Sequence, residues 1–210
     1  MKVGTDGVLL GAWALGGFRV LDAGTGTGVI ALMMAQRYPD ALVTAVDIDQ
    51  GAVLQARQNV LGAGQEARVA VLHERLQALG RNEDYRGRFD AIVSNPPFFA
   101  DSLKAPDAHR SIARHTDALS YGELMEASWH LLSSEGELSV IVPFDYRRRM
   151  EDEATFRGFF PSRQCAVRTA VGKPPRRYLL AFRKHPSSCQ REVLTIGDAR
   201  YRELTQDFYL

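Results

Sequence analysis

Residues 18–28 read FRVLDAGTGTG, an apolar run that ends at Asp22 and leads into a glycine-rich turn. The apolar run predicts a buried strand, and apolar residues at helical spacing after the turn predict a helix. The alternating glycines Gly24, Gly26 and Gly28 let the backbone turn sharply and approach a ligand without interference from a Cβ atom. The start of the following helix offers unpaired N–H groups. This stretch therefore predicts a strand–turn–helix unit that binds a ligand.

Strand-like and helix-like segments alternate outward from this unit. The expected strands are residues 18–22, 42–47, 69–72, 91–94, 137–142, 165–169, 178–182 and 193–196, and the expected helices are residues 29–37, 52–61, 121–132 and 151–160. This alternation predicts an α/β fold, a doubly wound and mostly parallel sheet with helices on both faces. Such sheets bind ligands at the carboxyl ends of their strands, near the point where the strand order reverses. The site is therefore expected just after Asp22, Asp47 and Ser94.

The composition indicates one domain over residues 1–210. A chain of 210 residues with 45% hydrophobic content can bury one sizeable core, and no Pro/Ser-rich linker divides it. The apolar stretch Val8–Phe18 is too short to span a bilayer and runs directly into the first strand, so we expect a cytoplasmic protein without membrane contact. Cys165 and Cys189 form no CxxC or Cys/His cluster, so no metal site is expected.

Charge is distributed unevenly along the chain. Residues 145–202 contain fourteen Lys and Arg against six Asp and Glu. A basic face would suit a polyanion, because phosphate neutralisation supplies most of the sequence-independent affinity for nucleic acid. A solvated basic surface is the alternative interpretation. The candidates for contact with a nucleic-acid backbone are two clusters, Arg147-Arg148-Arg149 and Lys173 with Arg176-Arg177.

A second acidic residue, Asp47, ends the next expected strand. A carboxylate at the tip of this strand can accept hydrogen bonds from both hydroxyls of a ribose, in NAD and in S-adenosylmethionine alike. The dinucleotide pattern GxGxxG would place the third glycine one residue after Gly28, which disfavours a nicotinamide oxidoreductase. Asp49 is expected to cap the helix that begins near Gln50.

The motif Asn95-Pro96-Pro97-Phe98 follows the fourth expected strand. An exocyclic amine such as adenine N6 is a poor nucleophile, because its lone pair is delocalised into the ring. The Asn95 side-chain oxygen and the Pro96 carbonyl could accept its two hydrogens, orient the nitrogen and localise the lone pair. The prolines fix the local backbone, and Phe98 could stack on the base. The motif predicts methyl transfer to a planar amino group without a strong general base, and a rigid structural turn is the alternative.

These motifs together resemble the class I amino methyltransferases. Nearly the whole chain resembles the bacterial tRNA1(Val) (adenine-37 N6)-methyltransferase family, through residues 1–10, the RRYLLAF stretch at 176–182 and the LTQDFYL stretch at 204–210. The resemblance implies a Rossmann-like class I methyltransferase fold with a seven-stranded sheet. It also implies S-adenosylmethionine as the cofactor and tRNA as the substrate, methylated on N6 of adenine 37 of tRNA(Val).

The resemblance further implies roles for single residues. Asp22 and the three glycines Gly24, Gly26 and Gly28 would hold the methionine part of the cofactor, Asp47 its ribose and Ile48 its adenine, with Lys2, Thr5 and Asp6 closing over it and Asn95 beside it. Asn95, Pro96 and Phe98 would carry the target amine.

The chain departs from the family pattern in two places. The family usually has an acidic residue after the third strand that contacts the cofactor adenine amine, whereas this chain reads His73-Glu74-Arg75-Leu76. Glu74 or a backbone group would take that role. The family also carries a segment before the stretch that begins here at Met1, so Met1 is expected to be an internal methionine of a longer chain.

Rival functions stay open at this point. The Asn-Pro-Pro motif is shared with N5-glutamine methyltransferases that act on proteins, and a non-catalytic module that binds S-adenosylmethionine or RNA would carry the same motifs. The long segment after the motif contains His109, Arg110, Arg114 and His115, and it is either a lid over a flipped nucleotide or an ordinary exposed loop.

Overall fold

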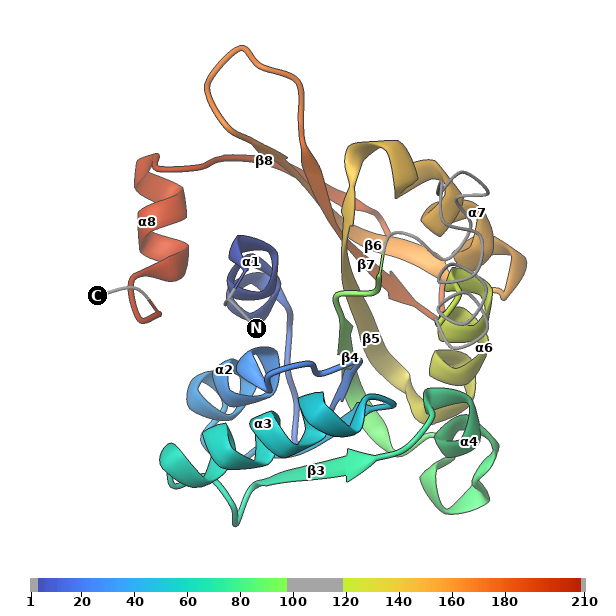
Figure 1. Cartoon of the computed structure of the whole chain (residues 1–210). Coiled ribbons are helices and arrows are strands. Elements are labelled where there is room, and N and C mark those ends of the chain that lie inside the picture. The colour runs from blue at the N-terminus through green and yellow to red at the C-terminus, as the bar shows by residue number, and fades with distance from the viewer. Residues whose placement is uncertain (1–3, 98–118, 209–210) are drawn as a thin grey trace, which may run out of the picture.

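An eight-stranded sheet runs through the part of the chain that the computed structural model describes, residues 4–97 and 119–208 (Figure 1). Its strands lie in the order β3-β2-β1-β4-β5-β7-β6-β8. Their bounds are β1 Arg19–Ala23, β2 Leu42–Asp47, β3 Val69–His73, β4 Phe89–Ser94, β5 Leu132–Pro143, β6 Phe160–Arg168, β7 Arg177–Arg183 and β8 Gln190–Thr195.

Strand direction places the carboxyl ends of most strands at one edge. Neighbouring strands from β3 to β5 pair in parallel, whereas β7 runs antiparallel to both β5 and β6. The strand order reverses between β1 and β4, which is where a doubly wound sheet binds its ligands. The α/β class with a doubly wound, mostly parallel sheet is therefore confirmed.

The resemblance implied seven strands, one too few, whereas the eight apolar segments expected as strands, 193–196 among them, each overlap a strand of the sheet. β8 pairs in parallel with β6, from Arg163 opposite Gln190 to Arg168 opposite Thr195, and so forms the eighth and outermost strand. Leu194 accounts for this addition, because its side chain is buried in the same core cluster as Val167 of β6. An extra strand at this edge leaves the reversal point between β1 and β4 unchanged.

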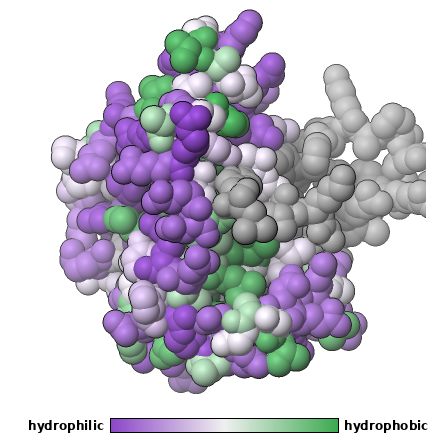
Figure 2. Space-filling model, turned by 90° about the vertical axis from the view of Figure 1, so that its left-hand side faces the viewer, coloured by the Kyte–Doolittle hydropathy of each residue, from purple (hydrophilic) through white to green (hydrophobic). Residues whose placement is uncertain are grey.

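The helices divide between the two faces of the sheet, each face with its own core. Helices α1 (Thr5–Trp13), α2 (Val29–Arg37), α3 (Gln50–Gly62) and α8 (Ala199–Thr205) pack on one face, and α4 (Leu76–Arg81), α6 (Tyr121–Leu131) and α7 (Arg147–Phe156) pack on the other. Alternation along the strands separates the cores: in β1, Val20 belongs to the first and Leu21 to the second. The outer surface on the side of α8 is mainly hydrophilic (Figure 2).

Several helix boundaries differ from the expected ones for local reasons. Residues 8–13 of α1 are all buried, so this helix shows no alternation between apolar and polar sides and was not predicted. Helix α7 ends at Phe156 rather than residue 160, because Gly158 adopts a φ of 89° and turns the chain. Phe159 can then pack edge-on against Trp129, with ring centroids 5.1 Å apart.

Two smaller expectations can be compared directly with the structure. Asp49 accepts a hydrogen bond from the Ala52 amide at 2.7 Å, which confirms that it caps α3. Within residues 4–97 and 119–208, every helix is too short or too polar to cross a membrane.

Candidate active site

A cavity of about 220 Å³ opens at the carboxyl edge of the sheet, beside the reversal point. The described residues that line it lie at or just after the carboxyl ends of the strands: β1 (Ala23, Gly24), β2 (Val46, Asp47, Ile48), β3 (Glu74, Arg75, Leu76, Gln77) and β4 (Ser94, Asn95, Pro96, Pro97), together with Leu119 before α6. The structure therefore brings the glycine-rich turn, the acid after β2 and the Asn-Pro-Pro motif together around one space.

The glycine-rich turn is held by backbone geometry that glycine alone adopts readily. Gly24, Gly26 and Gly28 have φ angles of 73°, 57° and 80°. The Gly24 amide donates a 2.9 Å hydrogen bond to the Val46 carbonyl, which fixes the turn to the end of β2. A Cβ atom on Gly24 would meet no atom within 4 Å, whereas one on Gly28 would lie 3.2 Å from the Ala56 Cβ. Gly24 thus leaves space at the cavity, and Gly28 allows α2 to approach α3.

Asp22 is buried beneath this turn. Its Oδ2 accepts hydrogen bonds from the Thr25 hydroxyl at 2.6 Å and from the Ala31 amide at 3.0 Å, and so links β1, the turn and α2. Burial away from water raises the pKa of this carboxyl to about 7. Its Oδ1 is buried without a hydrogen-bond partner. Among the described residues Asp22 does not itself line the cavity, so it acts on the turn from below.

Asp47 lies at the cavity wall and also orders the turn. Its Oδ2 accepts a 2.8 Å hydrogen bond from the Gly26 amide, and its Oδ1 accepts one of 2.9 Å from the Asp49 amide. Each carboxylate oxygen can accept a further hydrogen bond, so the group can still bind two hydroxyls. Ile48 follows, 38% exposed, with its carbonyl 2.9 Å from His73 Nε2. These contacts hold the two carboxylate oxygens of Asp47 beside the apolar side chain of Ile48.

Asn95 presents the polar atom that the motif requires. Its Oδ1 is buried and has no hydrogen-bond partner among residues 4–97 and 119–208, although Asn95 lines the cavity. The strand before it is fixed, since the buried Ser94 hydroxyl donates a 2.8 Å hydrogen bond to the Ala23 carbonyl of β1. Pro96 is buried and Pro97 is exposed. A buried acceptor without a donor is unusual in a folded chain and indicates a place where a ligand donates.

The segment after β3 forms one wall of the cavity. It is also the segment in which this chain departs from the family pattern, at Glu74-Arg75. Glu74 and Arg75 both line the cavity and are exposed. The Glu74 carboxylate accepts a 2.8 Å hydrogen bond from the Arg75 amide, and the Glu74 amide donates to the Asp47 carbonyl at 3.1 Å. Leu76 and Gln77 complete this wall. The sequence analysis assigned neither of these two residues a role, although their position just after a strand end was the available signal.

Two residues expected at the cofactor lie at the start of α1. Thr5 is exposed, and Asp6 forms an ion pair with Arg177 of β7, with Asp6 Oδ2 and Arg177 Nε 2.8 Å apart. Asp6 and Arg177 were expected to have separate roles, one at the cofactor and one at nucleic acid. The structure joins them across 171 residues of sequence.

Arg176 and Arg177 of the second basic cluster lie beside the carboxyl end of β5, just before the Arg147-Arg148-Arg149 cluster begins. Arg177 pairs with Pro143 in the sheet, and the Phe144 amide donates a 3.1 Å hydrogen bond to the Arg176 carbonyl. Arg148, Lys173 and Arg176 are exposed. Arg147 instead bonds to Glu151 at 2.9 Å, and its guanidinium lies 4.5 Å from the centre of the Tyr178 ring. Arg149 lies over Tyr121, 6.0 Å from that ring centre.

The remaining expected residues lie outside the described part of the chain. These are Lys2, Phe98 and the four residues His109, Arg110, Arg114 and His115.

Comparison with known proteins agrees with this geometry. The family model described as "Methyltransferase small domain" matches residues 9–157. Proteins named tRNA1(Val) (adenine(37)-N6)-methyltransferase from Bacteroides fragilis (strain YCH46) and Phocaeicola vulgatus are 44% and 46% identical, each over 100% of this chain and 91% of the relative. A crystal structure of a predicted O-methyltransferase from Agrobacterium tumefaciens superimposes with a TM-score of 0.75 at 17% identity, over 96% of both chains, and so shows the shared fold. The chain belongs to the methyltransferase small domain family and, within it, to the family of the tRNA1(Val) (adenine(37)-N6)-methyltransferases.

Proposed function

We propose that this chain transfers a methyl group from S-adenosylmethionine to N6 of an adenine in tRNA, adenine 37 of tRNA(Val). The observation that carries the proposal is the buried, unpartnered Asn95 Oδ1 at the cavity beside the glycine-rich turn. An adenine amine would supply the missing donor. The names of the full-length relatives support the choice of tRNA and of the nucleotide.

The residues around the cavity fit S-adenosylmethionine, which supplies an electrophilic methyl group when bound. Asp47 retains acceptor capacity for two ribose hydroxyls, and Ile48 offers an apolar surface for the adenine. Gly24 leaves open space for the methionine part. Asp22 would position the turn from beneath it. Lys2, Thr5 and Asp6 remain proposed closing residues, and Glu74 a proposed partner of the cofactor adenine.

The chemistry assigned to the Asn-Pro-Pro motif is orientation rather than base catalysis. The Asn95 oxygen and the Pro96 carbonyl would accept the two N6 hydrogens and direct the nitrogen lone pair at the methyl carbon. Bound there, the cofactor would supply the methyl group: a nitrogen–carbon bond would form as the carbon–sulfur bond breaks, and one N6 hydrogen would then leave to water as a proton. Phe98 would stack on the extruded base. Arg148, Lys173 and Arg176 would contact the tRNA backbone.

Substitution of Asn95 tests this assignment. Asn95→Ala should lower kcat by ~10² to 10³, the usual loss for removing one preorganised hydrogen-bonding group from a reacting centre. Its affinity for S-adenosylmethionine, measured by calorimetry, should stay within about twofold of wild type, because the loss falls on the reacting amine. A variant that methylates tRNA at the wild-type rate would show that Asn95 does not hold the amine. Methylation of glutamine in a protein, but not of tRNA, would favour the rival function.

A further inference from the structure

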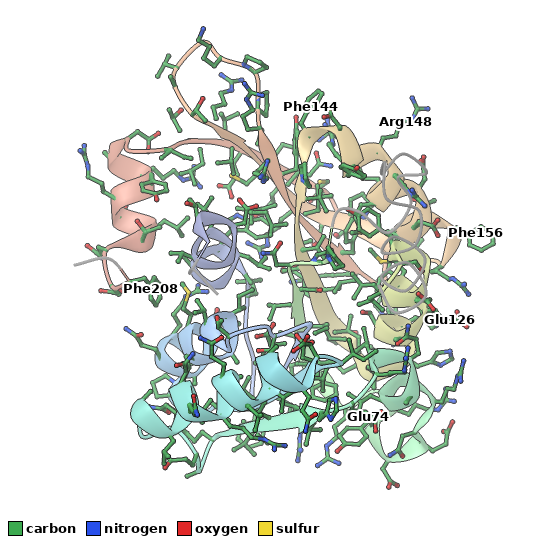
Figure 3. All side chains as sticks on the ribbon, viewed as in Figure 1. Glu74, Glu126, Phe144, Arg148, Phe156 and Phe208 are labelled. Carbon is green, nitrogen blue, oxygen red and sulfur yellow. The ribbon has the colours of Figure 1, made fainter. Side chains whose placement is uncertain are left out.

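One large apolar side chain is exposed among the basic residues at the active edge. Phe144 follows directly after β5, in the short 3-10 helix η2 (Phe144–Tyr146), and its side chain is 50% exposed. Phe144 begins η2, and Arg148 lies in the first turn of α7, which follows η2 directly. Figure 3 shows the two labelled side chains at the same end of the molecule. No periodic pattern of apolar residues singles out Phe144 in the sequence.

The Phe144 ring is held in place rather than loosely attached. Its amide donates a 3.1 Å hydrogen bond to the Arg176 carbonyl, which ties η2 to the start of β7. Its ring lies 6.1 Å from the Tyr178 ring, centre to centre, at an interplanar angle of 39°. The Arg147 guanidinium covers Tyr178 at 4.5 Å. A fixed ring loses little conformational entropy when a flat partner packs against it.

The charge around the ring favours a nucleic acid as that partner. Arg148 and Arg176 are exposed near it, against the neighbouring exposed acid Asp145. Arg148 lies four residues along the chain, and the Arg176 carbonyl accepts the hydrogen bond from the Phe144 amide. Proteins that bind single-stranded nucleic acid combine cations along the backbone with aromatic rings on which bases stack. An exposed aromatic ring within a basic surface fits this combination.

Register within the sheet relates Phe144 to the cavity. Ser94, the last residue of β4, lies opposite Val140 of β5, so Phe144 lies four residues beyond it along the neighbouring strand. Four residues of extended strand advance by about 13 Å. Stacked nucleotides advance by about 3.4 Å each, so the ring is within reach of nucleotides close to the target base.

We propose that Phe144 stacks on a base of the substrate tRNA that flanks the methylated adenine, with Arg148 and Arg176 contacting the adjoining phosphates. The proposal rests on the proposed tRNA methyltransferase function and adds a substrate-binding residue to it. Phe144 would act in substrate affinity and positioning, whereas Asn95 would act on the reacting amine.

The test compares Phe144→Ala, Phe144→Trp and the control Phe156→Ala. Phe156 is 80% exposed and is the last residue of α7, the helix that begins with Arg147-Arg148-Arg149. Figure 3 shows its side chain pointing away from Phe144. Binding of unmodified tRNA(Val) transcript is measured directly at several salt concentrations, and methylation kinetics are measured with the same RNA. Thermal unfolding checks that each exposed substitution leaves the fold intact.

Loss of stacking should raise the tRNA Kd and KM of Phe144→Ala by about 5-fold to 150-fold, the equivalent of ~1 to 3 kcal/mol per base. Its kcat, its affinity for S-adenosylmethionine and the slope of log Kd against log salt should remain at wild-type values. Phe144→Trp should bind tRNA nearly as tightly as wild type, because a larger ring still stacks.

Two results would overturn the proposal: Phe144→Ala binding tRNA as tightly as Phe156→Ala, or Phe144→Trp binding as weakly as Phe144→Ala. Failure of the proposed function would be seen separately. Wild-type protein would then bind the transcript without methylating it, and the Phe144 comparison could still be read from binding. A wild-type protein that binds no tRNA would overturn both.

Discussion

At the scale of single residues, two buried oxygens at the active edge lack hydrogen-bond partners, Asn95 Oδ1 and Asp22 Oδ1. A buried polar atom left unpaired costs about 1–3 kcal/mol, so a fold that keeps both of these atoms unpaired bears a penalty at this edge. The sequence predicted the importance of both residues from their positions at strand ends. It could not predict that Asp22 lies beneath the turn while Asn95 lines the cavity, because burial depends on how α2 packs.

The pKa of Asp22 makes stability depend on pH in a stated direction. Burial raises this pKa to about 7, from an ordinary value of 3.8, so the folded state holds a proton that the unfolded state has released between about pH 4 and pH 7. Stability contributed by this group is therefore lost as pH rises through that window. The Asp22→Asn variant cannot ionise at this position and does not lose this stability. The free energy of unfolding of the variant minus that of wild type should therefore increase by ~2–4 kcal/mol from pH 4.5 to pH 7.5. Urea unfolding at the two pH values measures this, and an unchanged difference would contradict the assigned burial effect.

Gly24 and Gly28 should respond differently to the same substitution. Both have positive φ angles, so alanine should destabilise the fold by ~1–2 kcal/mol at either position. Gly28→Ala should cost more, because its Cβ would press on Ala56 at 3.2 Å. Gly24→Ala should instead weaken cofactor binding, since its Cβ would point into open space at the cavity. Urea unfolding and calorimetric titration separate the two effects, and equal losses in both assays would refute the distinction.

At the scale of elements, the strands were predictable and several helices were not. Leu42–Asp47 was predicted to the residue, because its apolar run ends at a charged residue. Helix α1 was missed because residues 8–13 are all buried and show no polar side. Helix α4 was missed because its 6 residues are too few to show a helical repeat of apolar side chains. The start of β6 at Phe160 was missed because exposed residues such as Pro161 interrupt the apolar pattern.

Two adjacent arginines at the start of β7 have different surroundings: Arg176 ends the turn after β6, and Arg177 is the first residue of β7. Arg176 is exposed, whereas Arg177 is bound to Asp6 at 2.8 Å. Arg176→Ala should reduce the slope of log Kd for tRNA against log salt by about 1, the effect of one lost phosphate contact. Arg177→Ala should change this slope less and should lower stability by ~0.2–1 kcal/mol through loss of the partly exposed ion pair.

Arg191 provides the control for this comparison. It is exposed near the start of β8, and because β8 runs parallel to β6 it lies at the opposite edge of the sheet. Arg191→Ala should leave the slope unchanged. An effect of Arg191→Ala equal to that of Arg176→Ala would indicate diffuse attraction to the whole basic segment rather than contact at the active edge.

At the scale of the whole molecule, the strand order joins features that the sequence separates widely. Placing β4 between β1 and β5 brings the glycine-rich turn next to the Asn-Pro-Pro motif, and placing β7 beside β5 brings Arg176 next to Phe144. Alternation of elements predicts that strand ends converge, but it does not give the order of the strands. The sequence therefore indicated the cavity residues more completely than the basic surface, where it missed Phe144 and the pairing of Asp6 with Arg177.

The most direct measurement is to incubate the protein with methyl-labelled S-adenosylmethionine and unmodified tRNA transcripts, digest the RNA and identify labelled nucleosides by mass spectrometry. The account predicts labelled N6-methyladenosine at position 37 of tRNA(Val), with none in a transcript whose adenine 37 is replaced by guanine. Label on a different nucleoside, or no label in RNA from protein shown by calorimetry to bind S-adenosylmethionine, would contradict it.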